Sequence, residues 1–258
     1  MRYSESVLPV MRAIRDMLLP EWGVAKAVHQ KTASSWSVVT ALDIEIEKFV
    51  SAELAHLHPD IEFVGEEQGG NRSAKKFWLM DPIDGTAHFI RGLPFCTSML
   101  ALVDRGHVVF SAIYDFIHDE MYFADKGKGA FCNEKKLSVS SRTLKDSFVS
   151  FETDIAIEKN ANLRQKMLSQ TNVMTTFCAG WEFAMVASGK IDARICLDPF
   201  GQDYDFAPGT LLVMEAGGVV TNLDSHEFDY TNLDLIAANP LVYKDLTEGE
   251  SALFPLGR

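Results

Sequence analysis

The pattern of apolar segments changes near the middle of the chain, and this change constrains the fold more than any other feature. From residue 61 to about residue 151, short strand-like runs follow one another, separated by glycine and charged turns. After that point, strand-like runs alternate with helical segments expected near 159–169, 181–189 and 205–216. Because strands and helices both have to bury an apolar face, we expect a layered α/β (α+β) fold.

Helical patterns precede the strand-rich part. Residues 4–30 place apolar side chains at helical spacing, although Pro20 and Gly23 should break or kink the run. A second helical pattern covers residues 40–57. The polar residues 31–37 between these patterns are expected to form an exposed loop.

The length of the chain sets the expected domain organisation. With 258 residues, 47% of them hydrophobic, the chain can bury a sizeable core. No repeat, low-complexity tract or linker interrupts it. We therefore expect a single domain over residues 1–258, in which an N-terminal α+β half (about 1–150) packs against a C-terminal α/β half (about 151–258).

Composition excludes several classes of partner. A formal net charge of −12 would repel a nucleic-acid backbone, so no nucleic-acid partner is expected. No apolar run reaches the roughly eighteen residues of a membrane span, and the first residues lack the pattern of a secretory signal. We expect a cytoplasmic protein with no membrane partner.

The four widely spaced cysteines are expected to be ordinary buried thiols: Cys96, Cys132, Cys178 and Cys196.

The segment DPIDGT, residues 81–86, follows the apolar run 77–80 and carries the main chemical signal. Its proline fixes a tight turn, which can direct the carboxylates of Asp81 and Asp84 and the carbonyl of Ile83 at one point. Oxygens gathered in this way suit a hard divalent cation such as magnesium. Taken alone, the segment is equally well explained as an ordinary Asp-Pro turn that ends at a glycine.

Acidic residues near two other predicted element ends favour the metal site. Glu66 and Glu67 follow the strand-like run 61–64. Asp205 lies near the start of a helix, where it would by default be an N-cap. A helix start also attracts anions such as phosphate, because its amide hydrogens and its dipole end are positive.

With these segments in this order, the sequence resembles the inositol monophosphatase family of metal-dependent phosphatases. The motifs that carry the resemblance are GEE at 65–67, DPIDGT at 81–86, and DYDFAPG with EAGG within 203–218, supported by SVVTALD at 37–43 and GKGAFCN at 127–133. The resemblance implies a five-layer αβαβα sandwich of the inositol monophosphatase and fructose-bisphosphatase type. It also implies a homodimer that hydrolyses small phosphate monoesters with two to three magnesium ions. Manganese is expected to substitute, and lithium and calcium to inhibit.

The family's functional residues can be carried over position by position. The implied metal ligands are Glu66, Asp81, the carbonyl of Ile83, Asp84 and Asp205. Thr86, hydrogen-bonded to Asp43, would orient and help to deprotonate the attacking water. These acidic residues together with Thr86 and Asp43 form the implied catalytic set. The implied substrate-binding residues are Gly85, Thr86, Ala179 and Asp198.

Some residues keep alternative interpretations. Lys31 is either a surface lysine or the flap lysine that some relatives place near the metals. One extra residue separates it from TALD compared with the usual spacing, which counts against the flap interpretation. Glu67 is expected to be a surface or supporting residue rather than a ligand. His88, where relatives commonly carry asparagine, is expected to be a partly exposed and structurally neutral histidine.

The alcohol part of the substrate is less well defined than the reaction. Phe177 and Trp181 occupy the segment where many relatives have a smaller, more cationic wall. Inositol monophosphate is the first expectation. Histidinol phosphate, fructose 1,6-bisphosphate and 3'-phosphoadenosine 5'-phosphate are alternatives, and so is a weakly active protein that serves mainly as an interaction scaffold.

Overall fold

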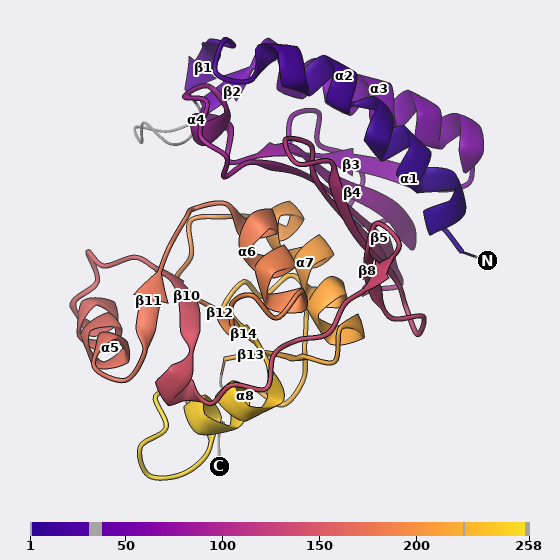
Figure 1. The fold of residues 1–258 in the computed structure, drawn as a ribbon. Coiled ribbons are helices and arrows are strands. Elements are labelled where there is room, and N and C mark those ends of the chain that lie inside the picture. Colours follow the sequence, from indigo (N-terminus) through magenta and orange to yellow (C-terminus); the bar gives the residue numbers. More distant parts are fainter. Residues whose placement is uncertain (1, 31–37, 224, 256–258) are drawn as a thin grey trace.

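The computed structural model describes residues 2–30, 38–223 and 225–255. Its helices and sheets form five stacked layers, as Figure 1 shows. The first layer of helices packs on a seven-stranded sheet, a central helix pair lies between this sheet and a five-stranded sheet, and further helices cover the outer face of the second sheet. The predicted αβαβα sandwich is thereby confirmed. The first helical layer contains α1 (Ser4–Ala13), α2 (Arg15–Leu18) and α3 (Ala41–Leu57). The central layer contains α6 (Ala179–Ala187) and α7 (Asp203–Glu215). The outer layer contains α5 (Glu158–Leu168) and α8 (Pro240–Thr247).

The seven-stranded sheet contains the strand-rich part of the sequence. Its strands follow chain order across the sheet: β3 (Glu62–Gly65), β4 (Lys76–Asp84), β5 (Thr97–Asp104), β6 (His107–Asp115), β7 (Glu120–Asp125), β8 (Ala130–Cys132) and β9 (Lys135–Lys136). β3 and β4 are parallel, whereas the other neighbours are antiparallel. β3 and β4 therefore end on the same edge of the sheet, which brings Glu66 and Asp81 toward each other.

The five-stranded sheet is built from the second half of the chain. Its order is β11 (Asn172–Met174), β10 (Phe148–Thr153), β12 (Ala193–Leu197), β14 (Leu235–Ala238) and β13 (Val219–Asn222). β10 is parallel to β11 and to β12, and the remaining pairs are antiparallel. The predicted alternation of strand and helix is confirmed here, although helix α8 was not anticipated.

The central helices α6 and α7 are buried on most of their surface because a sheet covers each side. One continuous apolar cluster includes residues of both sheets and of both helices. Gly209 allows the two helices to pack closely, since a Cβ atom at this position would lie 2.1 Å from the Cγ atom of Phe183. The halves expected from the sequence thus share a core.

The N-terminal segment has the predicted break near Pro20 and Gly23 but differs from the prediction over residues 27–30, which are extended and not helical. The helix predicted for residues 4–30 ends at Leu18 and is followed by a 3₁₀ turn, Leu19–Glu21, which contains Pro20. Residues Ala27–Gln30 form strand β1, antiparallel to β2 (Val38–Thr40). Proline cannot donate a helical hydrogen bond, and Gly23, with a φ of 75°, turns the chain away from the helix. The loop predicted for 31–37 lies outside the described residues.

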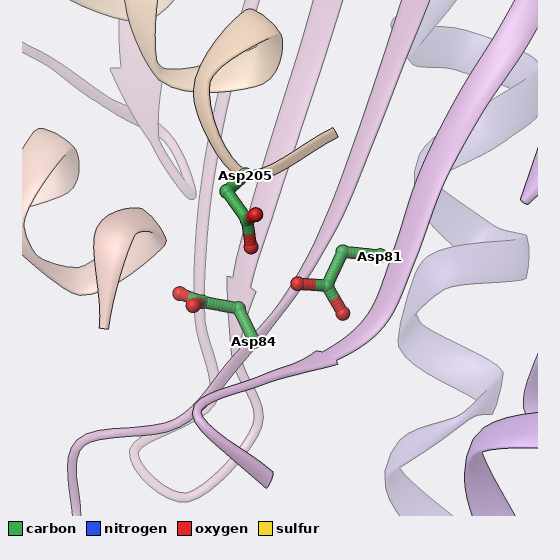
Figure 2. Close-up of side chains that lie close together, drawn as sticks. All are labelled: Asp81, Asp84 and Asp205. Atoms are coloured by element: carbon green, nitrogen blue, oxygen red, sulfur yellow. The ribbon is translucent and has the colours of Figure 1, made fainter. Parts of the chain in front are cut away.

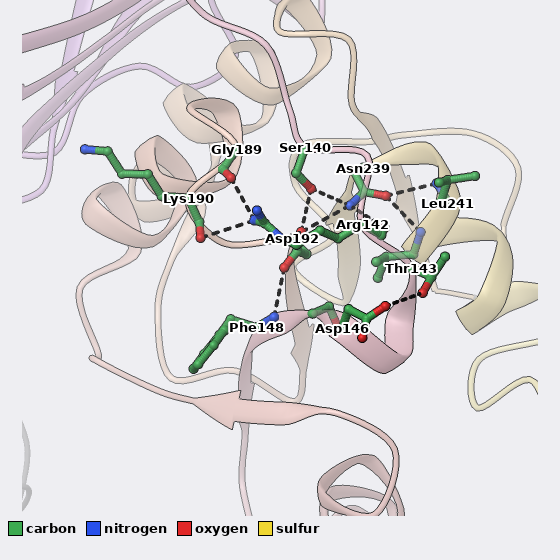
Figure 3. Close-up of polar contacts among 12 residues, drawn as sticks. Ser140, Arg142, Thr143, Asp146, Phe148, Gly189, Lys190, Asp192, Asn239 and Leu241 are labelled. Carbon is green, nitrogen blue, oxygen red and sulfur yellow. Dashed lines mark hydrogen bonds and ion pairs between the residues drawn. The ribbon is translucent and has the colours of Figure 1, made fainter.

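A buried aspartate fastens the segment that leads into the second sheet (Figure 3). Asp192 is fully buried and accepts hydrogen bonds from Ser140 Oγ (2.5 Å), Arg142 Nε (2.8 Å) and the Phe148 amide (2.8 Å). Asn239, the N-cap of α8, also donates to Ser140 and to Asp192. The start of β10 is thereby held against β12 and α8. Within the described residues, no helix has the length and apolar character needed to cross a membrane.

Candidate metal centre and active site

Carboxylates from the end of β4 and the start of α7 point toward one another, as Figure 2 shows for Asp81, Asp84 and Asp205. One oxygen of each lies within 4.8 Å of the others. The register of β4 against β5 shifts between Asp81 and Asp84, so the strand bends within the proline turn. The Ile83 amide donates to Asp81 Oδ1 (3.0 Å), which stabilises this bend. The predicted convergence of distant acidic residues is therefore present.

Burial and like charge act together on this cluster. Burial raises the pKa of Asp81 well above its ordinary value, and the neighbouring charges of Glu66, Asp205 and Asp84 raise it further. The pKa of Asp205 is raised in the same way, first by burial and then by Asp84 and Glu66. Glu66 is half-buried and hydrogen-bonded to Tyr204, so it lies at the same site. Like charges held this close are stable only when protonated or when paired with a cation.

Asp84 is held by donors from a different part of the chain. Its carboxylate accepts hydrogen bonds from the amides of Ala179 (3.2 Å) and Gly180 (2.7 Å) at the start of α6, and from Thr97 Oγ1 (3.2 Å) and Cys178 Sγ (3.0 Å). The positive N-terminal end of α6 therefore stabilises the ionised form of this carboxylate. Thr97, Cys178 and Gly180 did not stand out in the sequence. For Cys178 and Gly180, the only signal in the sequence was a short apolar helical run that starts after a polar loop.

Asp43 lies at the third position of α3, where it forms a capping box with Thr40. Its Oδ2 atom accepts from the Thr40 amide and hydroxyl, both at 2.7 Å. Burial raises the pKa of Asp43 to about 7, against the effect of these hydrogen bonds and with further help from Glu66 and Glu67. The Asp43 side chain is buried.

Thr86 begins the short helix α4 (Thr86–Phe89) directly after the acidic turn. Its hydroxyl donates to the Ile83 carbonyl at 2.8 Å and lies 3.4 Å from Asp43 Oδ1. The predicted hydrogen bond from Thr86 to Asp43 is thus present, but it is longer than the hydrogen bond from Thr86 to the Ile83 carbonyl. Gly85 has a φ of 81°, and a Cβ atom there would lie 2.5 Å from the Phe95 carbonyl oxygen, so this position requires glycine.

The hydroxyl of Thr86 gives a direct test of its role. On the role that the resemblance implies for this hydroxyl, we expect Thr86→Val to lower kcat by about a hundredfold to ten-thousandfold, the usual contribution of a group that takes part in proton transfer. Thr86→Ser keeps the hydroxyl and should keep most of the activity. Steady-state phosphate release measures both variants. Equal rates for Thr86→Val and wild type would show that the hydroxyl takes no part.

Other predicted residues have more varied surroundings. Asp198 is exposed, has a φ of 47°, and accepts from Asn160 Nδ2 at 2.8 Å. Glu67 is half-buried, and its amide donates to Glu47. His88 was expected to be partly exposed, but it is buried, with a pKa lowered by burial and by Arg91. The expectation for Lys31 falls outside the described residues.

Comparison with known proteins agrees with this geometry. The profile of the inositol monophosphatase family matches residues 7–252. The chain belongs to this family. An inositol-1-monophosphatase of Bacillus subtilis is 30% identical over 82% of each chain. A fructose-1,6-bisphosphatase/inositol-1-monophosphatase of Thermotoga maritima is 27% identical over 93% of each chain.

Solved structures of the inositol monophosphatase family have the same fold. An IMPase of Thermotoga maritima superposes with a TM-score of 0.86 at 26% identity and covers 95% of both chains. As a member of the inositol monophosphatase family, the chain is a phosphoric monoester hydrolase. The predicted enzyme class is thereby confirmed.

Proposed function

We propose that the protein is a magnesium-dependent phosphatase that releases inorganic phosphate from a small polyol or sugar phosphate, with inositol monophosphate as the first candidate. The observation that carries this proposal is the convergence of Asp81, Asp84 and Asp205 within 4.8 Å. The names of the relatives, inositol-1-monophosphatase and fructose-1,6-bisphosphatase/inositol-1-monophosphatase, support the same substrate class.

The donor set fits magnesium. Carboxylate and carbonyl oxygens are its preferred protein ligands. The pKa values of Asp81 and Asp205 are raised first by burial and then by neighbouring negative charges, which a bound cation would offset. We propose that two to three ions bind here, with manganese as a substitute and lithium and calcium as inhibitors. The proposed ligands are Glu66, Asp81, the Ile83 carbonyl, Asp84 and Asp205. When bound, such ions make water a better nucleophile and neutralise charge on the phosphoryl and leaving oxygens.

The protein's own groups then orient the reactants. Thr86 would position the attacking water, and its hydroxyl proton would turn from the Ile83 carbonyl to Asp43 Oδ1, which lies 3.4 Å away. This turn would also free the Ile83 carbonyl as a ligand. The N-terminal end of α7 offers a positive dipole to the phosphate. Gly85, Ala179 and Asp198 are the proposed contacts to the substrate.

Aromatic side chains near the ends of the loops that lead into α6 and α7 favour a second candidate substrate. Phe177 and Phe200 are 50% and 62% exposed, and their ring centroids lie 6.5 Å apart. Trp181 makes an edge contact with Phe95. A planar ring could stack on such a surface, which favours histidinol phosphate, and likewise 3'-phosphoadenosine 5'-phosphate, over fructose 1,6-bisphosphate.

The function is tested by phosphate release from inositol 1-phosphate, histidinol phosphate, fructose 1,6-bisphosphate and 3'-phosphoadenosine 5'-phosphate. Each substrate is assayed with magnesium and with EDTA. We expect magnesium-dependent turnover of at least one substrate, with inositol 1-phosphate first. If no substrate releases phosphate in a magnesium-dependent way, the protein is better described as an interaction scaffold.

Further properties implied by the family are proposed with their own tests. We propose a homodimer, to be tested by light scattering on a gel-filtration column, and a cytoplasmic location, to be tested by cell fractionation. We also propose that the chain unfolds as a single domain, because one apolar cluster contains residues of both sheets. A single urea transition seen by both near-UV and far-UV circular dichroism would support this.

A further inference from the structure

A buried ion triad contacts the two loops that enter α6 and α7. Arg194 on β12 is fully buried, and its two terminal nitrogens bind Glu182 of α6 and Glu152 of β10. Its guanidinium group also lies over the rings of Phe183 and Phe206, 5.0 and 5.3 Å from their centroids. Removing charges from water is costly, so a buried triad is weak evidence for added stability, and another role has to be considered.

Each glutamate of the triad also binds one loop. Glu182 Oε1 accepts from the amide (2.6 Å) and the hydroxyl (2.8 Å) of Thr176, in the loop that enters α6. Glu152 Oε1 accepts from the amide of Phe200 (2.9 Å), in the loop that enters α7. In both glutamates the other oxygen binds Arg194. The arginine thus connects two loops that are more than twenty residues apart in sequence.

Both loops lead directly into the metal centre. Residues 176–178 precede the amides of α6 that hold Asp84, and residues 198–202 precede Asp205. The loops contain backbone conformations that need support, since Phe177 and Asp198 have positive φ angles of 56° and 47°. Anchoring each loop to a buried carboxylate provides this support.

We propose that Arg194 is a positioning residue, which acts through Glu182 and Glu152 to hold the two loops that form the substrate side of the site. The inference rests on the proposed function and adds to it a determinant of substrate binding. The guanidinium group suits this role because its planar fork reaches two carboxylates at once. A lysine supplies the same charge but presents a single nitrogen.

Hydrogen exchange measured by mass spectrometry tests the proposal without requiring turnover. In Arg194→Lys we expect exchange in peptides covering 174–178 and 198–202 to accelerate by about tenfold or more, while peptides from β5 and β6 stay unchanged. The matched control is Arg142→Lys, because Arg142 also binds a buried aspartate in the same half but contacts neither loop. It should leave both loop peptides as in wild type.

A second variant tests the contact through Glu152 separately from the contact through Glu182. It also tests the proposal if Arg194→Lys does not fold. Glu152→Gln keeps the shape of the side chain but can no longer accept from both Arg194 and Phe200. We expect faster exchange in 198–202 and unchanged exchange in 174–178. Equal exchange of both loops in wild type, Glu152→Gln and any folded Arg194→Lys would overturn the proposal.

Kinetics add a readout that a purely structural role would not change. In folded Arg194→Lys at saturating magnesium, we expect KM for inositol 1-phosphate to rise by about tenfold and kcat to change by less than about threefold. If KM is unchanged and the activity falls only in proportion to the fraction of the variant that is folded, the positioning role is contradicted. If wild type releases no phosphate from any ester, the proposed function fails, whereas the exchange experiment still tests the loops.

Discussion

Replacing Asp81 by asparagine is expected to lower kcat at least about a thousandfold, because charge stabilisation at a reacting centre commonly contributes factors of this size. Asp81 is buried at the centre of the carboxylate cluster, beside Glu66, Asp84 and Asp205. The loss should appear in phosphate release under magnesium concentrations that saturate wild type. Wild-type rates would contradict the assignment.

The same substitution should leave the fold intact and stabilise the metal-free protein. Asparagine has nearly the same shape and removes one of the repelling charges, and its side-chain oxygen can still accept from the Ile83 amide. We expect the midpoint of urea unfolding in EDTA at pH 8 to rise. The matched control is Asp104→Asn, which removes a carboxylate from the far end of the same sheet, where it forms a 3.5 Å ion pair with Lys76. It should change neither kcat nor the midpoint appreciably, because ion pairs that remain partly exposed to solvent contribute little.

The second large effect is an opposite response of stability to pH with and without magnesium. Burial raises the pKa of Asp43 to about 7, and the pKa values of Asp81 and Asp205 are also raised, by burial and then by like charges. In the unfolded chain an aspartate titrates near pKa 3.9. Between these values the folded state binds more protons than the unfolded state. The stabilisation is therefore complete below about pH 4 and is lost as pH rises through the folded pKa.

We expect metal-free protein to lose stability from pH 5 to pH 8, by about 1.4 kcal/mol per pH unit for each group still titrating. Magnesium should reverse this trend, because it binds the ionised carboxylates and stabilises the folded state by about 2.7 kcal/mol at a hundred times its dissociation constant. Urea midpoints in EDTA and in magnesium, measured at pH 5, 6, 7 and 8, give both trends. A metal-free midpoint that rises over this range would contradict the account of the cluster.

Local pattern was enough to predict much of the fold, whereas the candidate site was predicted from local motifs together with the resemblance to the inositol monophosphatase family. The apolar run before Asp81 reads as a buried strand, and its proline turn limits where the following carboxylates can point. The position of Asp205 near a helix start was recognised from the local sequence, whereas its role as a metal ligand was implied by the resemblance to the family. These features depend on residues near one another in the chain, so their chemistry is visible without the tertiary structure.

The features that were missed depend on contacts between distant segments. Nothing near Thr97 indicates that its hydroxyl binds Asp84, and nothing near Glu182 indicates that it lies beside Arg194. Strand β1 was taken for helix because its apolar side chains recur at helical spacing, and the sequence near it does not show its pairing with β2. His88 was expected to be partly exposed because its burial is set by packing around Phe95, which the local sequence does not show.

The most direct measurement is anomalous X-ray scattering from a crystal soaked in manganese and phosphate. We expect at least one anomalous peak bounded by the carboxylates of Asp81, Asp84 and Asp205, with phosphate density beside it, and no such peak in crystals of Asp81→Asn. Fully soaked wild-type crystals without a peak among these three side chains would contradict the metal centre and the phosphatase mechanism built on it.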